Sequence, residues 1–251
     1  MDLTVQIRAG LQNQGYPAPS LSWIQSAMPN RNPLPPLPAL IATVKTRLLA
    51  ADLTNPSLLE PPAPSLPPNL SNPEIGEVKL DRDVAVQVLD IDNLAKSKWE
   101  QVEELEAIAR GEQTRGREII RLPTGGEEQQ QQDDGVSEGS SSAATTPPAS
   151  GRPTTTGNAA KAATHRLVLQ DCRGQRVYGL ERKRIERLGI GTLHIGEKLM
   201  LRRGAVVARG VVLLEPATCT VLGGKVEAWQ KAWVEGRLAR LQEAVGGDSR
   251  S

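Results

Sequence analysis

A polar, repetitive segment in the middle of the chain sets the strongest limit on the fold. It runs from Pro123 to Ala163 and contains runs of glutamine, serine and threonine, with Val136 as its only branched apolar residue. Such a segment buries too little apolar surface to offset the conformational entropy lost on ordering, so we expect it to be disordered. The folded part of the protein must therefore accommodate these 41 residues as an insertion.

The sequence on both sides of the segment has the pattern of β-strands. Val84, Val86 and Val88 recur at every second position, which predicts a first strand. Four more strands are expected after the segment, over residues 167–170, 176–180, 198–201 and 205–214. Five strands, with a short element at Ile185–Leu188 between the third and the fourth, match an OB-fold barrel. The insertion, about residues 110–164, then lies between strands 1 and 2.

Helical patterns surround this β-rich part. Residues 1–54 predict three short helices, and Asp92 or Asn93 can cap another helix directly after the first strand. Residues 55–76 contain seven prolines, which is typical of a stiff linker or of a strap laid over a surface. A last helix is expected over residues 225–245.

The terminal helix has an unusually wide apolar stripe. Trp229 and Trp233 form one row, and a second row lies beside it, made of Val234, Leu238, Leu241 and Val245. One row can pack on the barrel and the other on the N-terminal helices, although a partner protein is a rival for the stripe. The predicted fold is α+β, a three-helix domain (1–54) packed on a five-stranded OB-fold domain (77–245).

Composition restricts the class of protein. The formal net charge is +1, so no global charge indicates nucleic acid, yet the stretch from His165 to Gly210 has eleven Lys and Arg against four Asp and Glu. Cys172 and Cys219 are far apart and are expected to be small buried residues in a reducing compartment. The sequence has no signal-peptide pattern and no apolar run of membrane-spanning length, so we expect a soluble intracellular protein.

No pattern of catalytic residues stands out. His165 and His194 are the only histidines, and with two distant cysteines they provide no zinc-ligand spacing. The phosphate-binding, dinucleotide-binding and nucleophile-elbow motifs are absent from the sequence. The run Glu103-Glu104-Leu105-Glu106 is typical of a solvated helix face. We therefore expect a binding protein, not an enzyme, with no cofactor and no metal.

Direct binding of single-stranded DNA is a hypothesis that OB folds invite. It needs a basic groove and exposed aromatic rings on which bases stack. The candidate DNA contacts are basic residues after the insertion: Arg173, Arg176, Arg182, Lys183, Arg202 and Arg203. Tyr178 is the only aromatic residue in the four strands after the insertion, so such binding should be weak and salt-sensitive. A basic surface that faces an acidic protein partner is an equally open interpretation.

Several strings along the chain carry a family resemblance. They are Gly15-Tyr16-Pro17-Ala18-Pro19-Ser20-Leu21-Ser22-Trp23, Val88-Leu89-Asp90-Ile91, Ser97-Lys98-Trp99-Glu100, Leu169-Gln170-Asp171, Tyr178-Gly179-Leu180-Glu181, Gly196-Glu197-Lys198, residues 210–216 and residues 221–226. In this order the strings resemble fungal members of the RecQ-mediated genome instability protein 1 family. The resemblance covers most of the chain apart from the proline-rich stretch and the insertion.

The resemblance implies a function in DNA recombination. It implies a non-catalytic nuclear subunit of a complex with a RecQ-family helicase and a type IA topoisomerase III. This complex dissolves double Holliday junctions without crossovers. It further implies that the OB fold binds the topoisomerase and that the insertion reaches into the DNA gate of that enzyme. The chain ends soon after the terminal helix, so functions of a second OB domain are not expected.

The resemblance also implies particular site residues. The Gly-x-Lys turn of the family falls on Gly196-Glu197-Lys198, which makes Lys198 the expected topoisomerase contact from an exposed barrel turn. For the insertion we expect the working part to be its root, a charged stretch with apolar residues: Arg115, Arg117, Ile119, Ile120 and Arg121. Two hypotheses result: a topoisomerase cofactor, which we favour, and an autonomous single-stranded DNA-binding OB protein. Recombination intermediates are the expected DNA partner, and no membrane is expected.

Overall fold

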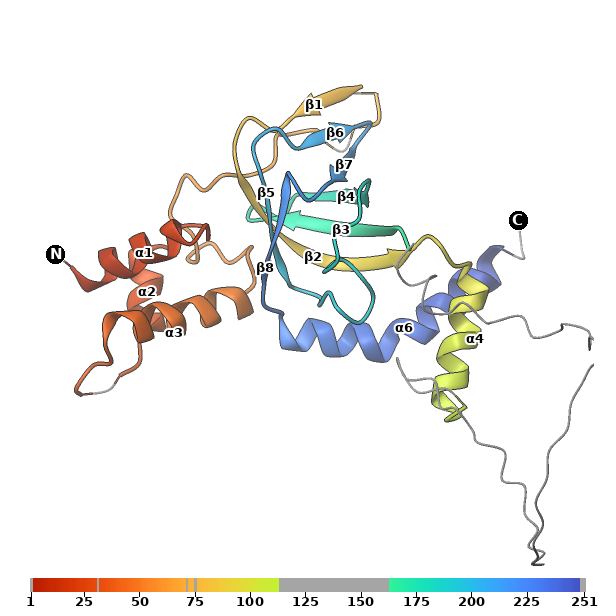
Figure 1. The fold of residues 1–251 in the computed structure, drawn as a ribbon, viewed down its shortest axis with the longest axis horizontal. Helices are drawn as coiled ribbons and strands as arrows, with labels where there is room; N and C mark the ends of the chain where they lie inside the picture. The colour runs from red at the N-terminus through yellow and green to blue at the C-terminus, as the bar shows by residue number, and fades with distance from the viewer. Residues whose placement is uncertain (1, 31, 71, 75, 113–162, 249–251) are drawn as a thin grey trace, which may run out of the picture.

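The computed structural model describes residues 2–248 apart from residues 31, 71, 75 and 113–162 (Figure 1). The segment expected to be disordered therefore lies outside the described residues, except for Ala163. The described residues form a helical domain and a curled β-sheet, with two more helices beyond the sheet (Figure 1).

Three helices form the N-terminal domain, as the sequence predicts. They are α1 (Leu3–Asn13), α2 (Leu21–Ala27) and α3 (Leu37–Ala50). The side chains of Asp2 and Ser20 accept hydrogen bonds from the backbone at the starts of α1 and α2, which satisfies donors that a helix terminus leaves free. Their common core consists of Ile7, Leu11, Ile24, Leu40 and Val44, all at most 1% exposed. The apolar positions spaced three or four residues apart thus pack together.

The sheet has eight strands among the described residues, not five. They are β1 (Glu77–Lys79), β2 (Val84–Asn93), β3 (His165–Asp171), β4 (Arg176–Glu181), β5 (Lys198–Leu201), β6 (Val206–Ala208), β7 (Val211–Leu214) and β8 (Cys219–Gly223). Their order is β1-β6-β7-β4-β3-β2-β5-β8, and β4 pairs with β7 in parallel while the other pairs are antiparallel. The five expected OB strands correspond to β2, β3, β4, β5 and, for the fifth, β6 together with β7.

The extra strands have local causes. The fifth expected strand is divided into β6 and β7 by Arg209 and Gly210, whose φ angles of 48° and 82° turn the chain into a hairpin. β1 is only three residues long and pairs with β6 at one edge, and β8 extends the other edge beside β5. Neither short edge strand has enough alternating residues for a sequence pattern to reveal it.

The helix after the first strand starts later than expected. β2 continues to Asn93, and α4 (Lys98–Ala109) is capped by Ser97, not by Asp92 or Asn93. Ser97 and Glu100 form a capping box, in which each side chain bonds the backbone of the other. Pairing of residues 91–93 with β3 extends the strand past the point where the local pattern suggested a helix.

The proline-rich stretch lies on the folded surface as a strap. Leu58 and Leu59 pack between the helical domain and the sheet, whereas Leu66 and Leu70 belong to the core of the barrel. The backbone N–H of Leu66 donates to the carboxylate of Asp171, at 2.9 Å, and this carboxylate is fully buried. The strap therefore connects the two domains by contacts along its length.

The terminal helix α6 (Glu227–Asp248) runs from the barrel to α4 (Figure 1). Trp229 and Trp233 are half-buried against the barrel core, and Nε1 of Trp233 donates to the carboxylate of Asp90 at 2.6 Å. The distal half of the helix contacts α4, not the N-terminal helices that we expected it to cover. The reason is that α4 extends from the end of β2 beyond the barrel and offers a helix to pack against.

Replacing Trp233 with alanine should lower the free energy of unfolding by about 2–3 kcal/mol, because the ring is half-buried and its bond to Asp90 is lost. Urea denaturation of the full chain measures this. Lys231→Ala, an exposed position on the same helix, is the matched control and should change little. Unchanged stability of Trp233→Ala would mean that the tryptophan does not anchor the helix.

Candidate interaction sites

Lys198 lies inside the molecule. Its side chain is 1% exposed, and its ammonium group donates a hydrogen bond to the backbone carbonyl of Gly196 at 2.6 Å. On the sheet, Lys198 pairs with Gln87 of β2. The expectation that an exposed turn presents Lys198 to a partner is therefore wrong. The charged head turns back onto its own turn because the helical domain and strap cover this side of the sheet.

A buried polar network surrounds the Lys198 position. The side-chain carbonyl of Gln87 accepts from the backbone N–H of Leu53 at 2.8 Å, and its amide donates to Asp52 at 2.8 Å and Gln170 at 3.1 Å. Burial raises the pKa of Asp52, but hydrogen bonds from Gln87 and Thr54 outweigh it and leave the pKa below its ordinary value. The network joins the end of the helical domain to two strands.

Burial lowers the pKa of Lys198 to about 8, and the nearby charge of Asp52 opposes this shift only in part. The ammonium has one hydrogen bond to the protein and little access to water. The buried position therefore disfavours the charged form of this lysine.

The insertion leaves the described fold after α4 and returns to it just before β3. The first end leaves from α4, which packs against α6. At the other end, the backbone carbonyl of Ala163 accepts from Arg184 at 3.2 Å, and that of Thr164 accepts from Leu94 N–H at 2.9 Å. The expected root residues lie outside the described residues: Arg115, Arg117, Ile119, Ile120 and Arg121.

A buried carboxylate organises the second end. Glu181, 6% exposed, accepts hydrogen bonds from Nδ1 of His165 at 2.9 Å and from the backbone N–H of Ile185 at 2.8 Å. Arg184 forms a salt bridge with it at 3.2 Å. Buried charge is costly unless it is paired and hydrogen-bonded, and this carboxylate is both. Ala163 and His165 are thereby attached to the segment that follows β4.

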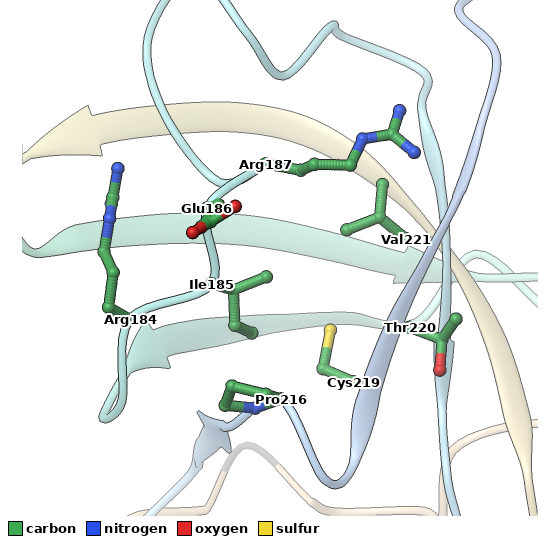
Figure 2. Close-up of a pocket in the computed structure, with 8 residues that line it drawn as sticks. All are labelled: Arg184, Ile185, Glu186, Arg187, Pro216, Cys219, Thr220 and Val221. Carbon is green, nitrogen blue, oxygen red and sulfur yellow. The ribbon is translucent and has the colours of Figure 1, made fainter.

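A shallow hollow of about 370 Å³ lies beside this segment (Figure 2). Its lining residues are Arg184, Ile185, Glu186, Arg187, Pro216, Cys219, Thr220 and Val221. Arg187 at its rim forms a salt bridge of 2.9 Å with the buried carboxylate of Glu197, which lies in the Gly196-Glu197-Lys198 turn. Burial raises the pKa of Cys219 to about 12, so this thiol stays protonated and unreactive at neutral pH.

The candidate DNA contacts do not form one groove. Arg173 and Arg176 lie at the β3–β4 hairpin and are exposed, whereas Arg182 and Lys183 lie beyond the other end of β4. The latter two side chains both pair with Glu215, at 2.8 and 2.9 Å. Arg202 and Arg203 lie at the β5–β6 turn, where both bond Asp83. The six candidate contacts are thus divided among three places.

The described residues also bear on metal and membrane binding. Among them, no three His, Cys, Asp or Glu side chains gather closely enough to hold a metal ion. None of the described helices is long and apolar enough to span a bilayer.

Two family models match the chain. One, described as the N-terminal OB-fold domain of RMI1, covers residues 66–237, and the other, described as the N-terminal helical domain of RMI1, covers residues 11–56. The chain belongs to the RMI1 family. The first match includes all eight strands of the sheet, α4 and the first half of α6, and the second includes the end of α1 with all of α2 and α3.

A curated relative agrees with this membership. The chain is similar to RecQ-mediated genome instability protein 1 of Schizosaccharomyces pombe (strain 972 / ATCC 24843), with 42% identity over 81 residues. That match covers 32% of this chain and 33% of the relative. The chain thus spans about a third of the length of the curated relative that it matches.

Sequence reasoning missed several residues of this RMI1-family chain that the structure brings together. Glu181, Arg184 and His165 lie up to nineteen positions apart and carry no motif. Arg166 was missed as a surface residue, although alternation along β3 already places it on the outer face. The one available signal was Glu181, which the alternation of β4 places on the inner face beside apolar residues.

The pKa of Lys198 predicts how stability depends on pH. The folded-state pKa of about 8 lies below the ordinary 10.5, so the charged ammonium opposes folding below pH 8, and this opposition weakens as pH rises through 8 towards 10.5. Between pH 7 and pH 9 the native protein should gain about 1 kcal/mol of unfolding free energy relative to Lys198→Met. Paired denaturation curves at the two pH values measure the difference. An equal gap at both values would contradict the shifted pKa.

Proposed function

We propose that this chain is a non-catalytic OB-fold subunit of a complex between a RecQ-family helicase and topoisomerase III, acting in the nucleus. In this proposal it stimulates decatenation and the dissolution of double Holliday junctions, limits crossovers and so maintains genome stability. The observation that supports it most is an OB fold of the RMI1 family whose strands β2 and β3 are joined by a long insertion held at both ends.

An insertion that reaches into the DNA gate of another enzyme must leave its own fold from fixed ends. A flexible chain of about 41 residues, the length over which the composition predicts disorder, would have an r.m.s. span of about 35 Å and could reach a neighbouring enzyme, but only fixed roots would determine where it is directed. α6 supports the first root through Gln242, which donates to Glu106 of α4 at 2.9 Å, near the end of α4 that the insertion follows. Arg184 and Glu181 hold the second root. In the proposal, recombination intermediates meet the insertion when the topoisomerase opens its gate.

The topoisomerase contact is placed on the turn from His194 to Lys198 and on the neighbouring Arg187. Glu197 is buried and accepts from both the backbone of His194, at 2.9 Å, and Arg187. The side chain of Arg187 is 58% exposed and is available to a partner. Lys198 acts as a positioning residue here, because its ammonium bonds the carbonyl of Gly196 inside the turn.

Replacing Lys198 with alanine should weaken capture of topoisomerase III, since it removes the internal bond of the turn. A pull-down with the purified partner measures this, and Lys198→Met, which keeps the apolar stem, should be affected equally. Lys79→Ala, on the edge strand β1, is the control. Normal capture by both Lys198 variants would show that Lys198 does not position the turn for the partner.

Deletions within the insertion should distinguish binding of the topoisomerase from stimulation of its decatenation activity. Replacing residues 123–162 with a short Gly/Ser bridge should preserve topoisomerase capture and decatenation, whereas replacing residues 115–162 should preserve capture and reduce decatenation. Ala163 stays in both variants because it is buried and its carbonyl is bonded to Arg184. The measurement is decatenation of linked single-stranded circles at matched salt. Full stimulation by the longer deletion would leave the chain only a tethering role.

A further inference from the structure

Among the described residues, β8 forms one edge of the sheet and β1 forms the other. Charged residues or proline usually protect such edges, because an open edge can pair with another chain. β1 follows this rule, since two of its three residues, Glu77 and Lys79, are charged. The five residues of β8, Cys219–Gly223, include neither a charge nor a proline. β8 is therefore an edge without the usual protection against a further strand.

The pairing of β8 with β5 shows which backbone groups face outwards. In an antiparallel pair, residues that bond the neighbouring strand alternate with residues that point away from it. The backbone N–H of Arg202 donates to the carbonyl of Thr218 at 2.8 Å. Two residues further along, Thr220 therefore also bonds β5, opposite Met200, whereas Val221 points to the free edge. Among the described residues, no hydrogen bond outside the β5 pairing involves the N–H or the carbonyl of Val221.

The apolar hollow described above lies beside this free edge (Figure 2). Val221 and Cys219 line it from β8, and Ile185 lines it from the segment that follows β4. Directly paired residues of neighbouring strands share a sheet face. The residue of an added strand that lies opposite Val221 would therefore point its side chain into the hollow, towards Ile185 and Pro216. An apolar side chain fits this position.

A cation lies at one end of the free edge. A Cβ atom on Gly223 would lie 4.0 Å from Nη2 of Arg187, which places the guanidinium beside the last residue of β8. Arg187 bonds Glu197 at 2.9 Å, but a guanidinium has several donors and this side chain is 58% exposed. Figure 2 shows Arg187 extending to the Val221 side of the hollow, away from Glu186. A carboxylate would be bound at the Gly223 end of the edge.

We infer that the free edge of β8 binds an extended segment of topoisomerase III as an added strand, with an apolar side chain opposite Val221 and a carboxylate at Arg187. In such binding, bonds between main chains give affinity and the pockets for side chains give specificity. The inference rests on the proposed function, whose topoisomerase contact already includes Arg187, and it specifies the form in which the enzyme is bound.

A second copy of the chain is the competing occupant of an open edge. Its own β8 would bring Cys219 and Val221, whose side chains already pack against the core of its own barrel and cannot fill the hollow. It would also bring no carboxylate from β8 to Arg187, since that strand has no charged residue. A topoisomerase segment with an apolar and an acidic side chain satisfies both features.

Replacing Val221 with proline tests the added strand. Proline removes an N–H that points away from β5, and it is tolerated on edge strands. In a titration of purified topoisomerase III with the full chain, Val221→Pro should bind about tenfold more weakly than the native chain. Lys79→Pro is the matched control and should bind normally. Its N–H also points outwards, at the other edge, because the neighbouring Leu80 bonds Ala205 at 2.9 Å.

Hydrogen exchange of the native chain provides a second readout, which decides the question even where Val221→Pro does not fold. The amide of Val221 should exchange about tenfold more slowly in the topoisomerase complex than in the free chain, while that of Lys79 should not change. An unchanged rate at Val221, or native-like binding by folded Val221→Pro, overturns the inference and leaves the proposed function standing. Native chain that binds no topoisomerase removes both. Native dimers that Val221→Pro abolishes, with topoisomerase binding unchanged, assign the edge to a second copy instead.

Discussion

The buried amide of Gln87 joins the two domains of the molecule. Its oxygen accepts from the backbone N–H of Leu53, three residues after the end of α3, and its nitrogen donates to Asp52 and Gln170. An amide without exposure must find partners inside the protein or destabilise it by about 1–3 kcal/mol, so these three groups have little freedom to move apart. The position of the helical domain against β2, and the covering of Lys198, both depend on this contact.

Close packing supports the same junction from other elements. Leu48 of α3, Ala85 of β2 and Met200 of β5 form one cluster with Leu58 and Leu59 of the strap. Gly224 lies opposite α3 so closely that a Cβ there would come within 2.4 Å of the carbonyl oxygen of Leu49. The helical domain is thus fitted to the barrel by shape as well as by hydrogen bonds, which gives the OB fold a rigid base.

Charged groups, more than apolar packing, hold the second root of the insertion. Glu181 and His165 are buried at a place where the inner face of the sheet would otherwise be apolar, and Arg184 extends their network to the carbonyl of Ala163. Directional bonds define where a chain leaves a fold more sharply than apolar contacts do. That property suits an insertion whose proposed work depends on its direction.

Local signals account for the parts of the fold that could be predicted. Ser20 caps α2 because capping acts between residues three apart, and β3 and β4 alternate between buried and more exposed residues within single strands. The start of α4 and the edges of the sheet could not be read this way. Pairing of residues 91–93 with β3 and the hairpin at Arg209 depend on neighbours that are distant in sequence or on backbone conformation.

The sequence by itself determined the fold class, the three N-terminal helices and the family resemblance, because each rests on residue types at fixed local spacing. Only the tertiary structure decided that Lys198 is buried, that α6 packs on α4, and that Tyr178 stands exposed beside Arg166. The reason is that exposure and contact are set by what covers a residue. The elements that cover these positions come from other parts of the chain, and no local sequence pattern indicates which distant elements will pack there.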